Sequence, residues 1–284
     1  MARRVSAVER SKATARSRHG FEAFSWGGAI GVLSGLIGLG GAEFRLPVLV
    51  GRFRLAALEA VIINKAISLM VVVAALVFRS STIPLQEVVG HAHVVLTLLA
   101  GSLVGAWLAA GRAIQLSART LSRLMLFLLT TLALAMVAEG LVGLHRIGRP
   151  LIGEGHLQTA AGVAAGCVIG AVTALLGVAG GELLIPALVL LFAVDIKVAG
   201  SLSLAVSLPT MLVGFARYRK AGAFRALARD RRLVAWMAAG SVTGAALGVL
   251  LLGVVPTKAL TLLLGLVLTV SAVKVFWQAK DRTS

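Results

Sequence analysis

The chain has 284 residues, of which 58% are apolar and only 14% charged, and its net charge is +17. A soluble domain of this length could not bury so much apolar surface, so we expect lipid to surround most of the chain. The basic excess does not indicate a nucleic-acid-binding protein. Nearly all basic residues lie in the tail and in the loops between apolar runs, where the positive-inside bias of membrane proteins places them.

The first 23 residues are basic and polar, and the apolar segment behind them is too long for a cleavable signal peptide. We expect a cytoplasmic tail near anionic lipid. The predicted divisions are this tail (1–23), a first membrane repeat (24–144), a linker (145–156), a second membrane repeat (157–277) and a C-terminal tail (278–284). Both termini are predicted to be cytoplasmic, in a multi-pass protein of the cell (inner) membrane.

Eight apolar runs follow the tail, and several of them reach the roughly 20 residues needed to cross a bilayer. The runs are continuous rather than alternating, which favours helices over the strands of a barrel. The predicted fold is an all-α polytopic membrane protein. Its eight hydrophobic segments are residues 24–50, 57–78, 88–110, 121–144, 157–193, 197–216, 232–253 and 256–277.

The first and fifth segments contain nearly the same phrase, GVLSGLIGLGGAEFRLPVLV at 31–50 and GAVTALLGVAGGELLIPALV at 170–189. The phrases align without a gap at an offset of 139, and the same offset matches LAGSLVGAWLA at 99–109 with AAGSVTGAALG at 238–248. One register over most of each half indicates an internal duplication into two four-segment repeats. Duplicated halves in a membrane protein are typical of transporters, with the binding site where the repeats meet.

Loop charge bears on whether the repeats are parallel or inverted. The loop after the second segment has Arg79 alone, whereas the matched loop has seven basic residues between positions 217 and 232. A parallel pair should carry similar charge in matched loops, so the difference favours inversion. Each half would then be a re-entrant hairpin followed by three spanning helices. Eight full crossings also obey the positive-inside rule, so segments 24–50 and 157–193 could still span fully.

Glycines and a proline interrupt the first segment of each half. Non-helical backbone at membrane depth is tolerated where it lines a cavity or is buried in protein, and half-helix N-termini favour anions. We therefore predict a pair of broken helices facing one anion site. The residues at the breaks are Gly38, Gly40, Gly41 and Pro47 in the first half and Gly177, Gly180, Gly181 and Pro186 in the second.

Close helix packing is the alternative use of glycine in a membrane. We prefer it for a second set of glycines, because their four-residue spacing makes one smooth helix face. These are Gly101, Gly105, Gly240, Gly244 and Gly248.

The phrases GLIGLGGAEFRLPVLV and ALLGVAGGELLIPALV, with the four-plus-four layout, resemble the TauE/SafE sulfite exporter family over essentially the whole chain. This family includes transporters similar to 4-toluene sulfonate uptake permeases. The resemblance implies an inner-membrane transporter of sulfur-containing oxoanions or organosulfonates, such as sulfite or sulfoacetate. The chain departs from the usual triple glycine, with Gly40-Gly41-Ala42 in one copy and Ala179-Gly180-Gly181 in the other.

Ionisable side chains within spanning segments are costly, so each one suggests a function. Glu43 and Glu182 hold matched positions and are predicted proton carriers or charge partners, because a buried carboxyl tends to keep its proton. Arg45 and Lys65 occur only in the first half and could compensate a dehydrated anion. The alternatives are a surface loop for Glu43 and Arg45, and snorkelling to the interface for Lys65.

Hydroxyls and amides are good donors for an oxoanion, although lone Ser and Thr residues in membrane helices often bond only their own backbone. The candidates at matched positions are Ser34 with Thr173, Asn64 with Ser203, and Ser68 with Ser207. Together with Lys65 and the glycines Gly40, Gly41, Gly180 and Gly181, they form the predicted substrate-binding set.

No metal, cofactor or enzymatic site is predicted. His91 and His93 lack cysteine or carboxylate neighbours at useful spacing for a metal. No histidine in a spanning segment could serve Ser34 as a base, and no phosphate-binding loop is present. Cys167 is the single cysteine, so no disulfide framework exists.

The leading hypothesis is a secondary transporter for a small sulfur-containing anion, in contact with the lipid bilayer. An anion channel and a non-transporting membrane partner of another protein are the alternatives.

Overall fold

The computed structural model describes residues 20–55, 57–112, 127, 130–134, 136–138, 141, 153, 155–176, 180–218 and 228–281, and every regular element in these ranges is a helix. Six of these helices are long and apolar enough to cross a membrane, which confirms a polytopic all-α membrane protein. They are Gly20–Gly38, Glu59–Arg79, Ala92–Ala109, His156–Ala174, Ile196–Val213 and Arg231–Leu252. The described residues do not include residues 1–19 of the tail, Gly177, most of the predicted segment 121–144 or most of the linker 145–156.

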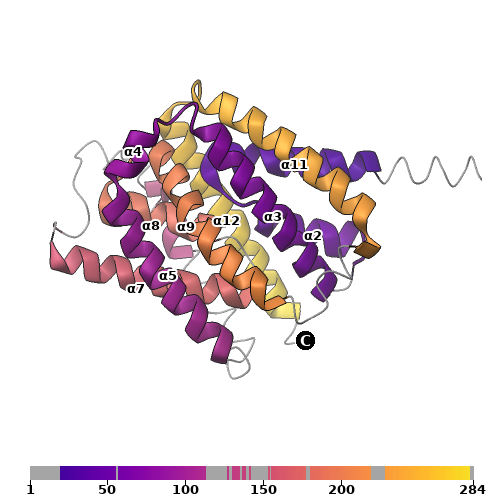
Figure 1. The fold of residues 1–284 in the computed structure, drawn as a ribbon, viewed down its shortest axis with the longest axis horizontal. Helices are drawn as coiled ribbons and strands as arrows, with labels where there is room; N and C mark the ends of the chain where they lie inside the picture. The colour runs from indigo at the N-terminus through magenta and orange to yellow at the C-terminus, as the bar shows by residue number, and fades with distance from the viewer. Residues whose placement is uncertain are drawn as a thin grey trace, which may run out of the picture.

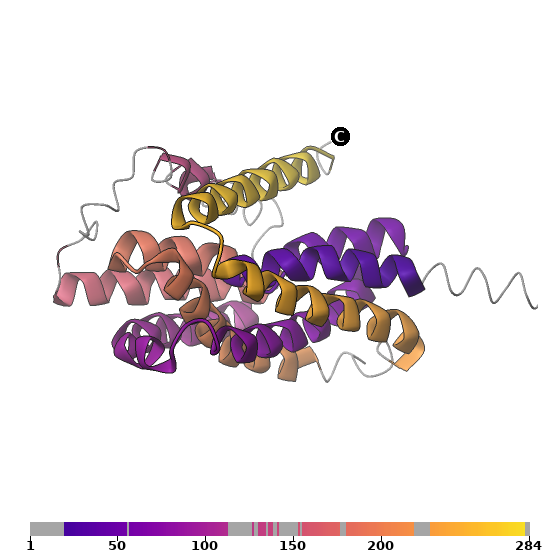
Figure 2. The same ribbon diagram turned by 90° about the horizontal axis from the view of Figure 1, so that it is seen from above.

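Figure 1 shows the helices coloured in chain order. Helix 20–38 ends in a π-helical turn, Ser34–Gly38, and α2 passes into a second π-helical turn, Val48–Arg52. Seen from above, α12 lies across one side of the other helices (Figure 2). The bounds are α2 Ala42–Pro47, α3 Ala57–Arg79, α4 Leu85–Gly90, α5 Ala92–Arg112, α7 His156–Leu176, α8 Gly181–Phe192, α9 Ile196–Tyr218, α11 Arg231–Leu252 and α12 Thr257–Asp281.

The chain reverses direction between helix 20–38 and α2. Gly41 has a left-handed backbone, with φ of 67°, which glycine adopts without the strain that a Cβ would bring. A Cβ at Gly41 would meet Ser34 Oγ and would lie 2.7 Å from Ile30 Cγ2. In a straight helix, residues 30 and 41 would be about 16 Å apart. Helix 20–38 and residues 42–52 therefore form a helix hairpin, called the first hairpin below.

The second half repeats this reversal. Gly180 has φ of 80°, and a Cβ there would lie 2.5 Å from Thr173 Cγ2 and 3.7 Å from Ile169 Cγ2. Helices α7 and α8 thus form the second hairpin. The 12 residues of α8 rise about 18 Å, less than the roughly 30 Å of a bilayer core, so α8 alone is too short to span. Segments 24–50 and 157–193 each fold as a hairpin rather than as one spanning helix.

Helices α3 and α9 run antiparallel. Arg79, the last residue of α3, donates hydrogen bonds to the Lys197 carbonyl at 2.5 Å and to Ser201 Oγ at 3.0 Å. Both acceptors lie in the first two turns of α9. The end of one helix therefore lies beside the start of the other.

Each hairpin packs against a helix of the other half through glycines. A Cβ at Gly105 of α5 would overlap the Cys167 carbonyl of α7, and one at Gly244 of α11 would overlap the Gly28 carbonyl. The glycines predicted for close packing, Gly101, Gly105, Gly240, Gly244 and Gly248, all lie at these two crossings, which confirms that prediction.

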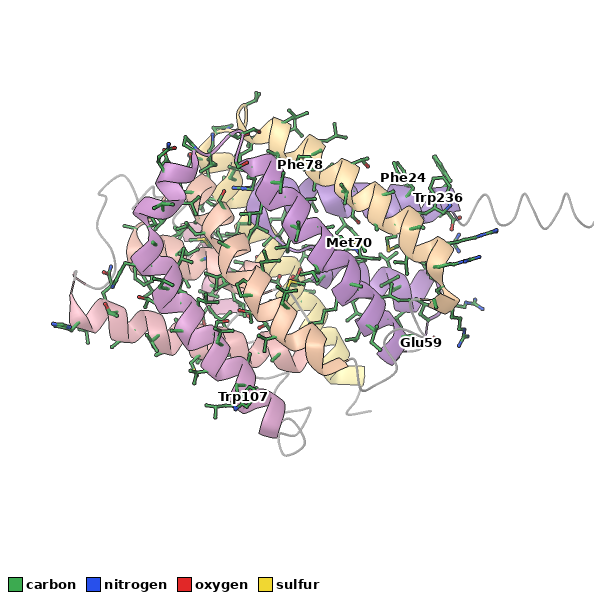
Figure 3. The ribbon with its side chains drawn as sticks, viewed as in Figure 1. Phe24, Glu59, Met70, Phe78, Trp107 and Trp236 are labelled. Carbon is green, nitrogen blue, oxygen red and sulfur yellow. The ribbon has the colours of Figure 1, made fainter. Side chains whose placement is uncertain are left out.

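Aromatic rings extend the crossing of helix 20–38 and α11. Phe24 and Trp236 meet edge to face with their ring centroids 6.4 Å apart, and both are labelled in Figure 3. The apolar core has two parts, and helices of both halves contribute to them. Leu188, Leu202 and Leu264 belong to a core around α8, α9 and α12, whereas Met237 of α11 belongs to a core around α3. Helix α11 of the second half is therefore part of the core of the first.

Candidate functional site

A buried guanidinium lies just after the break in the first hairpin. The Arg45 side chain is fully buried, which contradicts the alternative of a surface loop. Its Nη1 donates to Ser68 Oγ at 2.8 Å and to Asn64 Oδ1 at 3.4 Å, and its Nη2 donates to Ser241 Oγ at 3.4 Å. Arg45, Asn64, Ser68 and Ser241 are called the Arg45 cluster below. Its members come from α2, α3 and α11, and hence from both halves of the chain.

Asn64 fixes this cluster to the break. Its Nδ2 donates to the Ala42 carbonyl at 2.9 Å, so α3 is bonded to the first residue of α2. Burying an arginine in an apolar protein is costly unless polar groups surround it. The amide of Asn64 and the two hydroxyls provide such groups, and the structure thus brings together three predicted residues, Arg45, Asn64 and Ser68.

Two further ionisable side chains of the predicted set lie close by in sequence. Glu43 is half-buried, two residues before Arg45, and it interacts electrostatically with the Arg45 guanidinium. Lys65 follows Asn64 on α3 and is only 3% exposed, so it does not lie at an open surface. The first half therefore concentrates two buried cations and one carboxylate around its glycine break.

The two breaks meet through the second half. Ser203 Oγ of α9 donates to the Gly38 carbonyl at 2.9 Å, as well as to the Gly200 carbonyl of its own helix. A Cβ at Gly181 would lie 3.2 Å from the Gly38 carbonyl oxygen and from Leu39 Cα. Gly40 is also buried. The backbone of each hairpin turn is thus covered by the other half.

Glu182 lies in the first turn of α8 and is 3% exposed. It accepts a hydrogen bond from Ser271 Oγ of α12 at 3.0 Å. Glu43 and Glu182 hold matched sequence positions, yet Glu43 interacts with a cation and Glu182 with a hydroxyl. Each acidic residue that follows a glycine break therefore contacts a polar or charged side chain of the described part of the chain.

The remaining predicted hydroxyls divide into two kinds. Ser34 Oγ donates to the Ile30 carbonyl and Thr173 Oγ1 to the Gly170 carbonyl, so both bond their own helix backbone. Ser207 is 2% exposed, and its Oγ has no hydrogen-bond partner among the described residues. Ser207 is therefore the predicted hydroxyl in the second half that has spare hydrogen-bonding capacity.

The prolines contribute less to the breaks than predicted. Pro186 lies inside α8, which continues through it, so the predicted break at this residue is wrong. A proline inside a helix removes one hydrogen bond and its ring clashes with the carbonyl four residues earlier, which kinks a helix but does not by itself reverse the chain. Pro47 lies where α2 passes into the π-helical turn. The chain reversal itself comes from the glycines, with positive φ at Gly38, Gly41 and Gly180.

Two residues of this region were missed by the sequence analysis. Ser241 lies on the glycine-rich face of α11, for which the sequence pattern predicts only a packing role, and it accepts a hydrogen bond from Arg45. The sequence pattern places Arg79 among the loop charges, yet the residue is 1% exposed and donates four hydrogen bonds. Its place as the last residue of an apolar run, rather than in the loop beyond, was the signal that could have identified it.

The arrangement suits a small anion. The Arg45 guanidinium is a fixed cation, its Nε has no hydrogen-bond acceptor among the described residues, and hydroxyl and amide groups surround it. Within the described residues, no group of three His, Cys, Asp or Glu side chains could hold a metal ion.

The long apolar helices and the buried polar cluster define a multi-pass membrane protein with an internal polar site. A family model described as Sulfite exporter TauE/SafE matches residues 1–136 and 162–284. The chain therefore belongs to the TauE/SafE family of membrane transporters, as the glycine-rich phrases predicted. Comparisons with curated proteins and with solved structures gave no match.

Proposed function

We propose that the chain is a secondary transporter that moves a small sulfur-containing anion, sulfite or an organosulfonate, across the cytoplasmic membrane. The anion binds at the Arg45 cluster, next to the glycine breaks of the two hairpins. Membership of the TauE/SafE family supports the class of transporter and of substrate. The observation that carries the proposed site is the fully buried Arg45 side chain, which is held by residues of both halves.

A permanent cation at this depth needs a reason, because isolated buried charge is costly. The two hydroxyls and the Asn64 amide satisfy part of the guanidinium, and Nε remains a donor without an acceptor among the described residues. A sulfite or sulfonate group has several oxygens that can accept hydrogen bonds from the guanidinium. Lys65 and Ser207 complete the proposed binding residues.

Inverted repeats support alternating exposure of this site. Helix α3 begins at Ala57 and α9 at Ile196, 139 residues apart, which is the offset that aligns the two sequence copies. The two matched helices run antiparallel, as an inverted pair requires. In this topology the basic loops and both termini face the cytoplasm, and one half moves against the other.

Proton movement drives the transport in this proposal. Glu43 and Glu182 are the carboxylates beside the two breaks, and Glu182 accepts a hydrogen bond from Ser271 Oγ. A carboxyl that takes up a proton at one membrane face and releases it at the other couples anion flux to the proton gradient.

Sulfite counterflow in proteoliposomes tests the proposal. Wild-type protein should accumulate labelled sulfite when unlabelled sulfite is trapped inside, whereas a channel gives no counterflow and a non-transporting partner protein gives no flux. Arg45→Gln should abolish counterflow, because it removes the buried cation. Arg52→Gln is the matched control, since Arg52 lies in the same hairpin but pairs with Glu22 at the exposed surface.

A folded Arg45→Gln protein that transports sulfite at the wild-type rate would overturn the proposed site. Arg45→Lys serves as a second variant, because it keeps the positive charge and removes the paired N–H donors of the guanidinium. Absence of both flux and counterflow in folded wild-type protein would exclude sulfite and direct the same assay to organosulfonates, whereas flux without counterflow would indicate a channel.

A further inference from the structure

Arg79 connects the two halves of the chain at one end of α3. Its Nη1 donates to the Gly35 carbonyl at 2.7 Å and to the Leu36 carbonyl at 3.3 Å, both in the last turn of helix 20–38. Its Nε and Nη2 donate to Ser201 Oγ and to the Lys197 carbonyl of α9. One side chain therefore bonds the first hairpin and the second half at the same time.

The acceptors explain why a cation is stable here. The last carbonyls of a helix lack intrahelical donors and form the negative end of its dipole. Helix 20–38 stops at Gly38, so the carbonyls of Gly35 and Leu36 belong to its final turn. Arg79 thus satisfies the carbonyl end of the broken helix and fixes where the break at Gly38 to Gly41 begins.

All four acceptors are neutral. The ion pairs of Arg52 with Glu22 and of Arg229 with Glu59 do not include Arg79. Hydrogen bonds from a guanidinium to carbonyl and hydroxyl oxygens can be exchanged for bonds to water when the two halves separate. Release of a buried ion pair would instead leave a carboxylate unpaired, at much higher cost. The four hydrogen bonds of Arg79 therefore hold the two halves together and can be replaced by bonds to water when the halves separate.

We propose that Arg79 is a positioning residue that holds α9 against the first hairpin. Its hydrogen bonds to Ser201 and to the Lys197 carbonyl are called the latch. Release of Lys197 and Ser201 opens the binding site from this end of α3, while the bonds to Gly35 and Leu36 keep the broken helix in shape. The proposal rests on the transport function proposed above. In the inverted topology, this end of α3 faces away from the cytoplasm.

The test compares the accessibility of the two ends of α3, which Phe78 and Glu59 mark in Figure 3. Reporter cysteines are introduced one at a time into full-length Cys167→Ala protein in detergent. Val198→Cys lies next to Lys197 at the latch, and Ala60→Cys lies near the opposite end; both positions are buried. A hydrophilic maleimide reports how often each becomes exposed, and this measurement needs no transported anion.

The latch is weakened by Ser201→Ala, which removes one acceptor and keeps Arg79. We expect labelling of Val198→Cys to become about tenfold faster, since a hydrogen bond from a charged donor is lost. Labelling of Ala60→Cys should stay unchanged. Ser80→Ala is the matched control, because the Ser80 hydroxyl bonds only the Val77 carbonyl of its own helix.

Arg79→Lys keeps the charge without the paired N–H donors of the guanidinium, so it should give an intermediate labelling rate, with Arg79→Gln the fastest. Unchanged labelling at Val198→Cys in the Ser201→Ala protein would overturn the latch. Equal acceleration at both reporters would also overturn it, because that result indicates general loosening. Because labelling is independent of substrate, a failure of sulfite counterflow leaves this result readable.

Discussion

Ser203 on α9 donates a hydrogen bond to the carbonyl of Gly38, at 2.9 Å, across the two halves of the chain. Gly38 has a positive φ of 96° and ends helix 20–38, so its carbonyl has left the helical ladder. A buried carbonyl without a donor is costly. The break in the first half of the chain is therefore completed by a side chain of the second half.

Ser203→Ala should lower stability in detergent by about 1 kcal/mol, because the Gly38 carbonyl loses its donor. Thermal unfolding followed by fluorescence measures this change. The control is Thr243→Ala, whose hydroxyl bonds only carbonyls of its own helix. Equal effects of the two variants would show that the bond across the halves is unimportant.

Gly41→Ala should destabilise the first hairpin by about 1–2 kcal/mol from backbone strain alone, because residue 41 is left-handed. The added Cβ would also collide with Ser34 Oγ. Gly51→Ala is the control in the same hairpin, since a Cβ there meets nothing within 4 Å. The measurements are unfolding temperature and sulfite counterflow; a Gly41→Ala protein as stable as Gly51→Ala would contradict the observed turn.

Gly105→Ala should separate α5 from α7, because the new Cβ would overlap the backbone carbonyl of Cys167. Overpacking of this kind costs about 1–3 kcal/mol. A Cβ at Gly90, on α4, meets open space, so Gly90→Ala should be close to wild type. Denaturation in detergent distinguishes the two, and indistinguishable curves would rule out a tight α5–α7 crossing.

Glu182→Gln should uncouple sulfite movement from protons while sulfite counterflow continues, because the amide cannot carry a proton. A pH-sensitive dye inside proteoliposomes follows the protons that accompany sulfite. Glu87→Gln is the control, since Glu87 is exposed on α4. Proton movement that persists in Glu182→Gln would exclude this residue and leave Glu43 as the candidate.

The glycine breaks were predictable because the sequence repeats them. A phrase with glycines, an acid and a proline, present twice at one offset, indicated where the helices stop. The direction of the chain after each stop was not predictable, since a 27-residue apolar run can either span or turn back. That choice depends on the left-handed backbone at Gly41 and Gly180, which is a conformation and not a composition.

The candidate site was predictable only in part. Arg45 and Asn64 were predictable because charges and amides are rare in apolar runs, and Ser68 because its hydroxyl is matched by Ser207 in the second half. Ser241 was not, because a hydroxyl on a glycine face is usually a packing residue, and its bond to Arg45 depends on how α11 crosses the hairpin. Arg79 was missed for a related reason: the positive-inside rule counts charges and takes no account of burial.

The exchanged packing of the hairpins has a consequence for how the protein is made. Helix 20–38 has the glycines Gly31 and Gly35 against α11, and a Cβ at either would overlap the backbone of Ser241 or Ala245. On a ribosome, this face has no such partner until residues 231–252 have been synthesised. The two halves share a repeated phrase in sequence but are a single unit in assembly, so a gene split in the linker should yield folded protein only when both pieces enter the same membrane.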